Sequence, residues 1–185
     1  PKKTTNDIKK RNSEIEKAEE AFRTVIDHDP KILQARLNLA QLFLIKGQWI
    51  DAEEHYQEAL HLGDSSGVSE KKLGQIALKY RSDPTSAIDF FARALQKNSD
   101  VAAWIGYGVS LRAIGRFEQS EASYKEAIKL SPEAGEAWYN LGNLYRDSGR
   151  ADLAAVAYKK VVNGSNGDLI ELAREELARL NDIGR

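Results

Sequence analysis

The sequence predicts an all-α protein built from repeated helix–turn–helix units. Three observations predict it: a 34-residue repeat, apolar residues spaced for one face of a helix, and glycines between the two halves of each repeat. Residues 137–150, AWYNLGNLYRDSGR, align with residues 103–116, AWIGYGVSLRAIGR, at a shift of 34. Pro132 lies three such periods after Pro30, so the register extends over most of the chain.

The first half of each unit has an apolar face that contains one small residue. Trp138 is followed by Leu141, Gly142 and Tyr145 at steps of three, four and seven, which places all four on one side of an α-helix. The small residue recurs in register as Ala40, Gly74, Gly108 and Gly142. Because glycine is about 1 kcal/mol less favourable than alanine inside a helix, we expect a neighbouring helix to approach closely there.

The second half of each unit repeats a small, aromatic, small pattern, as in Ala52, Tyr56 and Ala59. Its steps of four and three again describe one helical face. Gly47, in register with Gly115 and Gly149, lies between the two halves, where the end of a helix favours a residue that tolerates positive φ. Each unit is therefore predicted to be a helix, a tight turn and a second helix.

These features together resemble the tetratricopeptide repeat family. The resemblance rests on the 34-residue period, the Trp-x2-Leu-Gly-x2-Tyr face, the Ala-x3-aromatic-x2-Ala face and the closing proline, and it covers nearly the whole chain. It implies a right-handed α-solenoid of tandem helix-turn-helix repeats with a C-terminal capping helix. We expect one superhelical domain over 1–185, divided into a partial N-terminal repeat at 1–32 with its helix near 13–28, repeats at 33–66, 67–100, 101–134 and 135–168, and a capping helix in 169–185.

The second full repeat departs from the pattern. Glu70 stands at the tryptophan position and Ala77 at the tyrosine position, and the turn between its helices is one residue longer. Asp83 as N-cap and Pro84 at the first helical position suit the start of a second helix. We expect this repeat to be helical but locally distorted or looser.

The two ends of the predicted solenoid differ. The last helix carries an apolar side that includes Leu169 and Leu177, while Glu175, Glu176 and Arg179 are expected to form a polar outer face that stops further stacking. At the other end only Ile8 is available as an apolar partner for the face formed by Ala18, Phe22 and Val25. This unfinished N-terminal edge could pair with a second copy.

Composition excludes several classes of function. With 27 Lys and Arg against 28 Asp and Glu, the formal net charge of -1 provides no field for a nucleic acid. The chain has no cysteine, which excludes disulfides and thiolate metal sites and leaves the compartment open. No apolar run is long enough for membrane insertion. No catalytic motif and no metal-binding spacing of the three histidines is present, so we expect neither enzymatic activity nor a cofactor or metal.

The resemblance implies a binding surface on the concave side of the solenoid, where the first helices of the repeats lie. Members of the family bind extended peptides or helices there, through positions two, five, six, nine and twelve of each repeat. The partner-binding residues that this implies are Gln34, Leu37, Asn38, Gln41, Lys71, Lys72, Gln75, Ile105, Val109, Arg112, Tyr139, Asn140, Asn143 and Arg146.

Two features of this groove suggest a ligand chemistry. Asn38 and Asn140 share position six, where some members carry an asparagine ladder that holds peptide backbone, but Lys72 and Gly106 interrupt it. The groove also carries a basic stretch that suits an acidic segment or a C-terminal carboxylate, formed by Lys71, Lys72, Lys79, Arg112 and Arg146. For both features the alternative, ordinary exposed side chains without a ligand, stays open. The carboxylate clamp of chaperone-tail binders is not present.

The function expected from these observations is that of a non-enzymatic adaptor. It would bind a peptide or helix of a partner protein, of acidic character, in its concave groove. Two alternatives stay open: a structural scaffold that self-assembles through its terminal repeats, and the binding arm of a larger enzyme whose catalytic domain lies outside the chain. The sequence leaves the oligomeric state undetermined.

Overall fold

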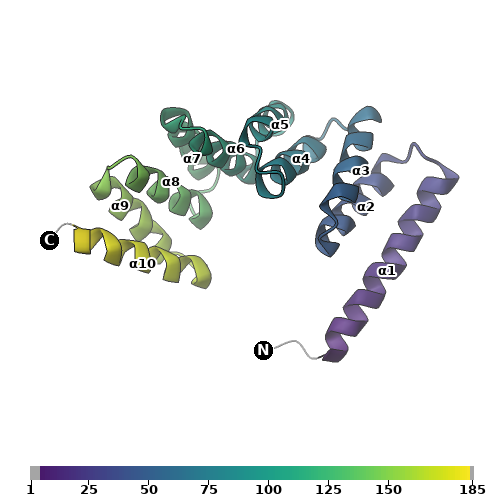
Figure 1. Ribbon diagram of the computed structural model, residues 1–185, viewed down its shortest axis with the longest axis horizontal. Helices are drawn as coiled ribbons and strands as arrows, with labels where there is room; N and C mark the ends of the chain where they lie inside the picture. Colours follow the sequence, from purple (N-terminus) through teal and green to yellow (C-terminus); the bar gives the residue numbers. More distant parts are fainter. Residues whose placement is uncertain (1–4, 184–185) are drawn as a thin grey trace.

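The computed structural model describes residues 5–183, with the side chains of residue 7 and residues 9–180. Within this part of the chain there are ten α-helices and no β-strand (Figure 1). The helices are α1 (Thr5–His28), α2 (Leu33–Lys46), α3 (Trp49–His61), α4 (Val68–Lys79), α5 (Pro84–Lys97), α6 (Val101–Ala113), α7 (Phe117–Leu130), α8 (Gly135–Asp147), α9 (Ala151–Val162) and α10 (Gly167–Ile183).

The helices pack in chain order, so that the molecule is an elongated solenoid. Each helix contacts the one before and the one after it, and α1 and α10 lie at opposite ends (Figure 1). The first helices of successive pairs also touch, α4 against α6, α6 against α8 and α8 against α10. The predicted all-α solenoid of tandem helix pairs is confirmed, and its first helices share one face.

The turns between paired helices follow the glycine prediction. Gly47 ends α2 with φ 76°, and its N–H and that of Gln48 donate to the carbonyls of Leu44 and Phe43. Gly115 and Gly149 have the same left-handed conformation after α6 and α8. These bonds satisfy carbonyls that the helix end would otherwise leave open.

The small residues of the first helices accept the aromatic rings of the second helices. A Cβ atom at Gly108 would lie 2.6 Å from Cε1 of Tyr124, and one at Gly142 would lie 2.6 Å from Cε1 of Tyr158. Both tyrosines are fully buried. The expectation that glycine marks close helix packing is therefore confirmed.

The second repeat is helical, as predicted, and its irregularity is confined to the turn. Ser82 takes a positive φ of 52° there, and the carboxylate of Asp83 accepts from the N–H of Ser86 as the N-cap of α5. The expected local distortion is therefore found at the turn, while Ala77 and Phe91 in the core of the repeat are at most 2% exposed. The apolar faces of the two helices keep their register, so the extra residue in the turn does not disturb the packing of the core.

Glu70, at the tryptophan position of this repeat, is held by charge rather than by packing. It is 4% exposed, and its Oε1 lies 2.5 Å from Nζ of Lys97. The same lysine donates to the backbone carbonyl of Asp64. A buried carboxylate needs such a partner to offset its desolvation.

The last helix caps the solenoid, and two of the three residues expected on its polar outer face are exposed. Glu175 and Arg179 are exposed, whereas Glu176 is only 6% exposed. Its carboxylate accepts from Arg146 of α8 and from Arg179. The expectation that Glu176 faces outward was wrong, because its carboxylate forms an ion pair with Arg146 on the preceding first helix.

The N-terminal edge is only partly covered. Helix α1 packs on α2 and begins at Thr5, earlier than the helix expected near 13–28. Phe22 is half-buried and Val25 is 38% exposed, whereas the equivalent Tyr56 and Ala59 of α3 are at most 1% exposed. The side chain of Ile8, which the sequence offered as the partner of this face, lies outside the described residues.

Candidate partner-binding groove

A cleft of about 550 Å³ crosses the first helices of all four pairs. Helices α2, α4, α6 and α8 each contribute to its wall, and we call it the central cleft. Its apolar lining includes Leu44, Leu78, Ile105 and Val109. Of the sequence-predicted groove residues it brings together Gln41, Gln75, Ile105 and Val109.

Two further clefts extend the central cleft toward both ends. The one at the N-terminal side, of about 430 Å³, is lined by the predicted residues Gln34, Leu37, Asn38 and Gln41. The one at the C-terminal side, of about 930 Å³, is lined by the predicted residues Ile105, Tyr139 and Asn140, together with Trp138 and Lys160. Gln41 lines both the central and the N-terminal cleft, and Ile105 lines both the central and the C-terminal cleft, so the three clefts are neighbours, and we call them together the groove.

The floor of the central cleft contains a residue that the sequence did not predict. Phe91 of α5 lies against Gly106, where a Cβ atom would overlap the Cζ atom of the phenyl ring. No asparagine fits at this position, so the interruption of the asparagine ladder there has a packing cause. Because Gly106 has no side chain, the ring of Phe91 can form part of the floor of the cleft.

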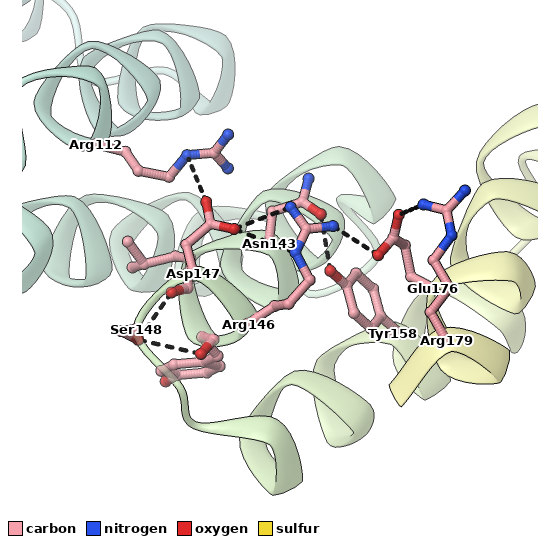
Figure 2. Close-up of polar contacts among 10 residues, drawn as sticks. Arg112, Asn143, Arg146, Asp147, Ser148, Tyr158, Glu176 and Arg179 are labelled. Carbon is pink, nitrogen blue, oxygen red and sulfur yellow. Dashed lines mark hydrogen bonds and ion pairs between the residues drawn. The ribbon is translucent and has the colours of Figure 1, made fainter. Parts of the chain in front are cut away.

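Most of the basic groove residues already have carboxylate partners within the chain. Lys71 of α4 pairs with Asp100, which also caps α6 by accepting from the N–H of Ala103. Arg112 lies 3.6 Å from Asp147, and Arg146 contacts both Asp147 and Glu176 at 2.9 and 2.6 Å (Figure 2). These contacts join one first helix to the next, so the positive charge of the groove is largely neutralised.

Two lysines of α4 have no carboxylate partner among the described residues. Lys72 is half-buried, and burial together with the neighbouring Lys71 lowers its pKa. Lys79 lines the central cleft with its ammonium 5.0 Å from the ring centroid of Tyr80. They lie seven residues apart on α4 and therefore share one face of the helix. An anionic group is the chemistry that would complement them.

The predicted amides are partly occupied by other side chains and by backbone. Asn38 accepts from Gln34 at 2.9 Å, and Asn140 donates to the carbonyl of Glu136 at 2.9 Å. Asn143 is 9% exposed and accepts from the hydroxyl of Tyr158 (Figure 2). Asn143 therefore supports the wall of the groove rather than its surface. The predicted Lys71, Lys72, Arg112, Asn143 and Arg146 line none of the three clefts.

Four residues outside the predicted positions also shape the groove or pair with its basic side chains, and the repeat pattern did not indicate them. Phe91 belongs to a second helix, and Asp100, Asp147 and Glu176 supply the carboxylates that neutralise the basic positions. A search for opposite charges about one repeat apart would have found these pairs, since Lys71 and Asp100 are 29 residues apart and Arg146 and Glu176 are 30 apart.

The described residues contain no cluster of three or more His, Asp or Glu side chains suited to a metal ion. In the same part of the chain, no helix is both long and apolar enough to cross a membrane.

Comparison with solved structures supports the fold. The crystal structure of MamA superposes with a TM-score of 0.75, covering 97% of this chain and 99% of that chain at 22% identity. YrrB, described as a TPR protein with an unusual peptide-binding site, covers 91% of this chain and 88% of that chain with a TM-score of 0.73 at 20% identity. At these identities the likeness shows the fold alone.

Sequence relatives match shorter parts of longer proteins. The chloroplast protein PYG7 of Arabidopsis thaliana, a tetratricopeptide repeat domain-containing protein, is 31% identical over 111 residues, which are 57% of this chain and 36% of the relative. The human protein O-mannosyl-transferase TMTC1 is 25% identical over 175 residues, which are 91% of this chain and 19% of the relative. The photosystem I assembly protein Ycf3 of Prochlorococcus marinus (strain MIT 9313) is 30% identical over 54% of this chain and 59% of its own length.

The family model described as tetratricopeptide repeat matches residues 7–67 and 108–168, which is more than half of the sequence. The matched segments contain α2 and α3, whose turn Gly47 forms, and α8 and α9, whose turn Gly149 forms. The chain therefore belongs to the tetratricopeptide repeat family.

Proposed function

We propose that this chain binds an extended or helical segment of a partner protein in the groove formed by its first helices. The observation that carries the proposal is the groove of three neighbouring clefts, whose central cleft has apolar walls contributed by α2, α4 and α6. Proteins of this family are generally protein-interaction scaffolds. The chain would then act as an adaptor without chemistry of its own.

The partner segment would carry an apolar anchor and an acidic residue. The anchor fits the central cleft between Leu78 and Ile105, over the ring of Phe91. The acidic residue fits Lys79, which lines the central cleft, and Lys72, which lies on the same face of α4 outside the cleft, because the other basic residues at the predicted positions are held by intramolecular carboxylates. The preference for an acidic residue in the partner therefore rests on two lysines rather than on the whole basic stretch.

Charge reversal on α4 tests this proposal. Peptides are first selected on the whole chain from a random library, and their affinity is then measured by calorimetry for the Lys72→Glu/Lys79→Glu variant. We expect a loss of at least tenfold, or about 1.4 kcal/mol. The matched control is Lys17→Glu/Lys129→Glu, which makes the same change in net charge at exposed lysines outside the groove. Equal affinity of both variants for the peptides contradicts the role of the two lysines.

A second candidate function is self-association through the N-terminal edge. Val25 is 38% exposed and Ile45 is 50% exposed, so apolar surface is open on α1 and α2. Light scattering over a wide range of concentrations tests it. A mass that rises with concentration in the native chain and stays at one monomer in Val25→Glu supports this candidate, while a constant monomer mass excludes it.

The third possibility is that the groove serves a larger enzyme. The chain spans 19% of the human relative, which is named as a transferase. In that case the segment bound in the groove would belong to a substrate or to a second domain. The full open reading frame that contains this sequence tests this possibility, because a larger enzyme requires a catalytic domain encoded in the same frame.

A further inference from the structure

The central cleft has a basic residue on one side and an acidic residue on the other. Among the described residues, the charged side chains that line it are Lys79 of α4 and Glu136 of α8. Glu136 also lines the C-terminal cleft, together with Glu133 and Lys160. Two carboxylates against one ammonium give that end of the groove a net negative charge, whereas Lys79, with Lys72 on the same face of α4, makes the other side positive.

The two carboxylates at the α8 side are not used within the chain. The side chains of Glu133 and Glu136 are exposed, and neither carboxylate forms an ion pair or a hydrogen bond with another described residue. Asn140 donates to the backbone carbonyl of Glu136 and not to its carboxylate. Asp100 and Glu176 differ in this respect, because basic residues of the first helices pair with them. The oxygens of Glu133 and Glu136 are therefore available to a ligand in the cleft.

The ammonium of Lys79 is available in the same way. Lys79 is exposed at the last residue of α4, and it pairs with no carboxylate among the described residues, Glu136 included. Helix α6 lies between α4 and α8, since it contacts both (Figure 1). The two charges thus stand on either side of α6, whose Ile105 and Val109 form part of the apolar lining of the same cleft.

We infer that the groove binds its partner segment in one direction, with an acidic residue at Lys79 and a basic residue at Glu136. The inference rests on the proposed function and extends it, because it adds a basic residue on the far side of the apolar anchor. Such a segment brings unlike charges together at both ends of the cleft. The same segment turned around would bring like charges together at both ends, which is unfavourable.

The surroundings of Glu136 suit a basic side chain of the partner. Trp138 and Tyr139 line the same cleft, and the ammonium of Lys160 lies 5.9 Å from the ring centroid of Trp138. An aromatic face that already contacts one cation therefore borders the two carboxylates. Arginine fits this place better than lysine, because a planar guanidinium can stack on a ring and bind a carboxylate through two hydrogen bonds.

A purely structural role of the two charges is the competing explanation. Glu136 lies in the first turn of α8 and Lys79 in the last turn of α4, where each charge interacts favourably with the helix dipole. That role would affect the stability of the chain and would not depend on the charges of a bound peptide. The test must therefore couple each protein charge to a charge of the peptide.

Exchange of the two charges tests the inference at constant net charge. Peptides are selected on the whole chain from a random library, and each is also made with its acidic and basic residues exchanged. We expect Lys79→Glu/Glu136→Lys to bind the selected peptide about tenfold more weakly than the native chain does, and the exchanged peptide about tenfold more tightly. The matched control, Lys17→Glu/Glu118→Lys, changes exposed residues outside the groove and should bind both peptides as the native chain does. An exchanged peptide that gains no affinity for the Lys79→Glu/Glu136→Lys variant overturns the inference.

A neutral variant keeps the test decisive if the reversed charges disturb folding. Both reversals oppose the helix dipole, so the helicity and Tm of each variant are measured first. Lys79→Gln/Glu136→Gln removes the two charges without reversing them, and it should lose most of the native chain's preference for the selected over the exchanged peptide. A preference as large as that of the native chain overturns the inference.

The two proposals fail in different ways. If no peptide binds the native chain, or if bound peptides are insensitive to all groove variants, the proposed function fails, and this inference fails with it. If Lys72→Glu/Lys79→Glu weakens binding while Glu136→Lys alone does not, or if the selected peptides carry no basic residue, the groove still binds an acidic segment and only the direction assigned through Glu136 is wrong.

Discussion

Arg146 of α8 donates from Nη1 to Oε2 of Glu176 on α10 at 2.6 Å, and this contact joins the last helix to the groove wall (Figure 2). Glu176 lies 34 residues after Gly142, at the register where earlier first helices carry a small residue. Burial lowers the pKa of Arg146, but the hydrogen bonds to Glu176 and Asp147 outweigh this and hold it above its usual value. The same arginine thus joins α8 to the capping helix through Glu176 and contacts Asp147 of its own helix.

Loss of the Glu176 carboxylate should loosen the last helix. Glu176→Gln leaves the partly buried charge of Arg146 with one carboxylate fewer, and we expect the free energy of unfolding to fall by about 2 kcal/mol in urea denaturation. Hydrogen exchange should speed up first in α10. Glu175→Gln, with a side chain 62% exposed, is the control and should change stability by less than about 0.5 kcal/mol. Equal effects of the two variants would refute this account of the cap.

A methyl group at Gly108 should destabilise the fold although it favours the helix. Alanine gains about 1 kcal/mol in helix propensity, but its Cβ would lie 2.6 Å from Cε1 of the fully buried Tyr124. Overpacking of this kind costs about 1–3 kcal/mol, so we expect Gly108→Ala to lower Tm. Gly135→Ala, with no atom nearer than 3.7 Å, should be neutral or stabilising. The prediction fails if Gly108→Ala raises Tm as Gly135→Ala does.

Stability should depend on pH through Glu121. Burial raises the pKa of this carboxyl, but hydrogen bonds from Lys125, Arg150 and Tyr145 outweigh it and lower the pKa to about 2 from its usual 4.5. Because the folded-state pKa is depressed, the stabilisation is complete above pH 4.5 and is lost as the pH falls toward 2. We expect Glu121→Gln to be less stable than the native chain by on the order of 1 kcal/mol at pH 7, since solvent screens these partners. The difference should narrow below pH 4.5; a gap that stays constant to pH 2.5 contradicts this assignment.

Two variants of Asp100 should separate its contribution as the N-cap of α6 from that of its ion pair with Lys71. Asp100→Asn keeps an oxygen that accepts from the N–H of Ala103 but loses the ion pair with Lys71, whereas Asp100→Ala loses both. We expect the alanine variant to be less stable than the asparagine variant by about 1 kcal/mol in chemical denaturation. The asparagine variant should also bind acidic peptides more tightly, because Lys71 becomes available to them. Equal stability of the two variants would show that the cap contributes nothing.

The fold was predictable because its signals are local and repeated. Gly47 and its equivalents mark turns by backbone conformation, and the small residues at Gly108 and Gly142 mark where rings pack, so both follow from the sequence alone. The inward position of Glu176 did not follow. A glutamate on an amphipathic helix is predicted to be exposed unless the arginine that pairs with it is known.

The groove was predictable in location and less so in charge. Gln41, Ile105 and Val109 line the central cleft because the repeat register alone decides which side of a first helix faces inward. The neutralisation of Lys71 and Arg112 depends on side chains from the next repeat. The contribution of Phe91 from a second helix depends on how deeply its ring penetrates beside Gly106. Such contacts between repeats depend on how neighbouring helices pack in three dimensions, which the repeat register does not specify.

Chemical-shift mapping of the isotope-labelled chain with a selected peptide tests the central claim most directly. The account predicts that amide signals shift along the groove, at Gln41, Gln75, Ile105 and Val109, while those around the exposed Ile50 and Val156 stay in place. Shifts confined to Ile50 and Val156, with the groove signals unchanged, would contradict it.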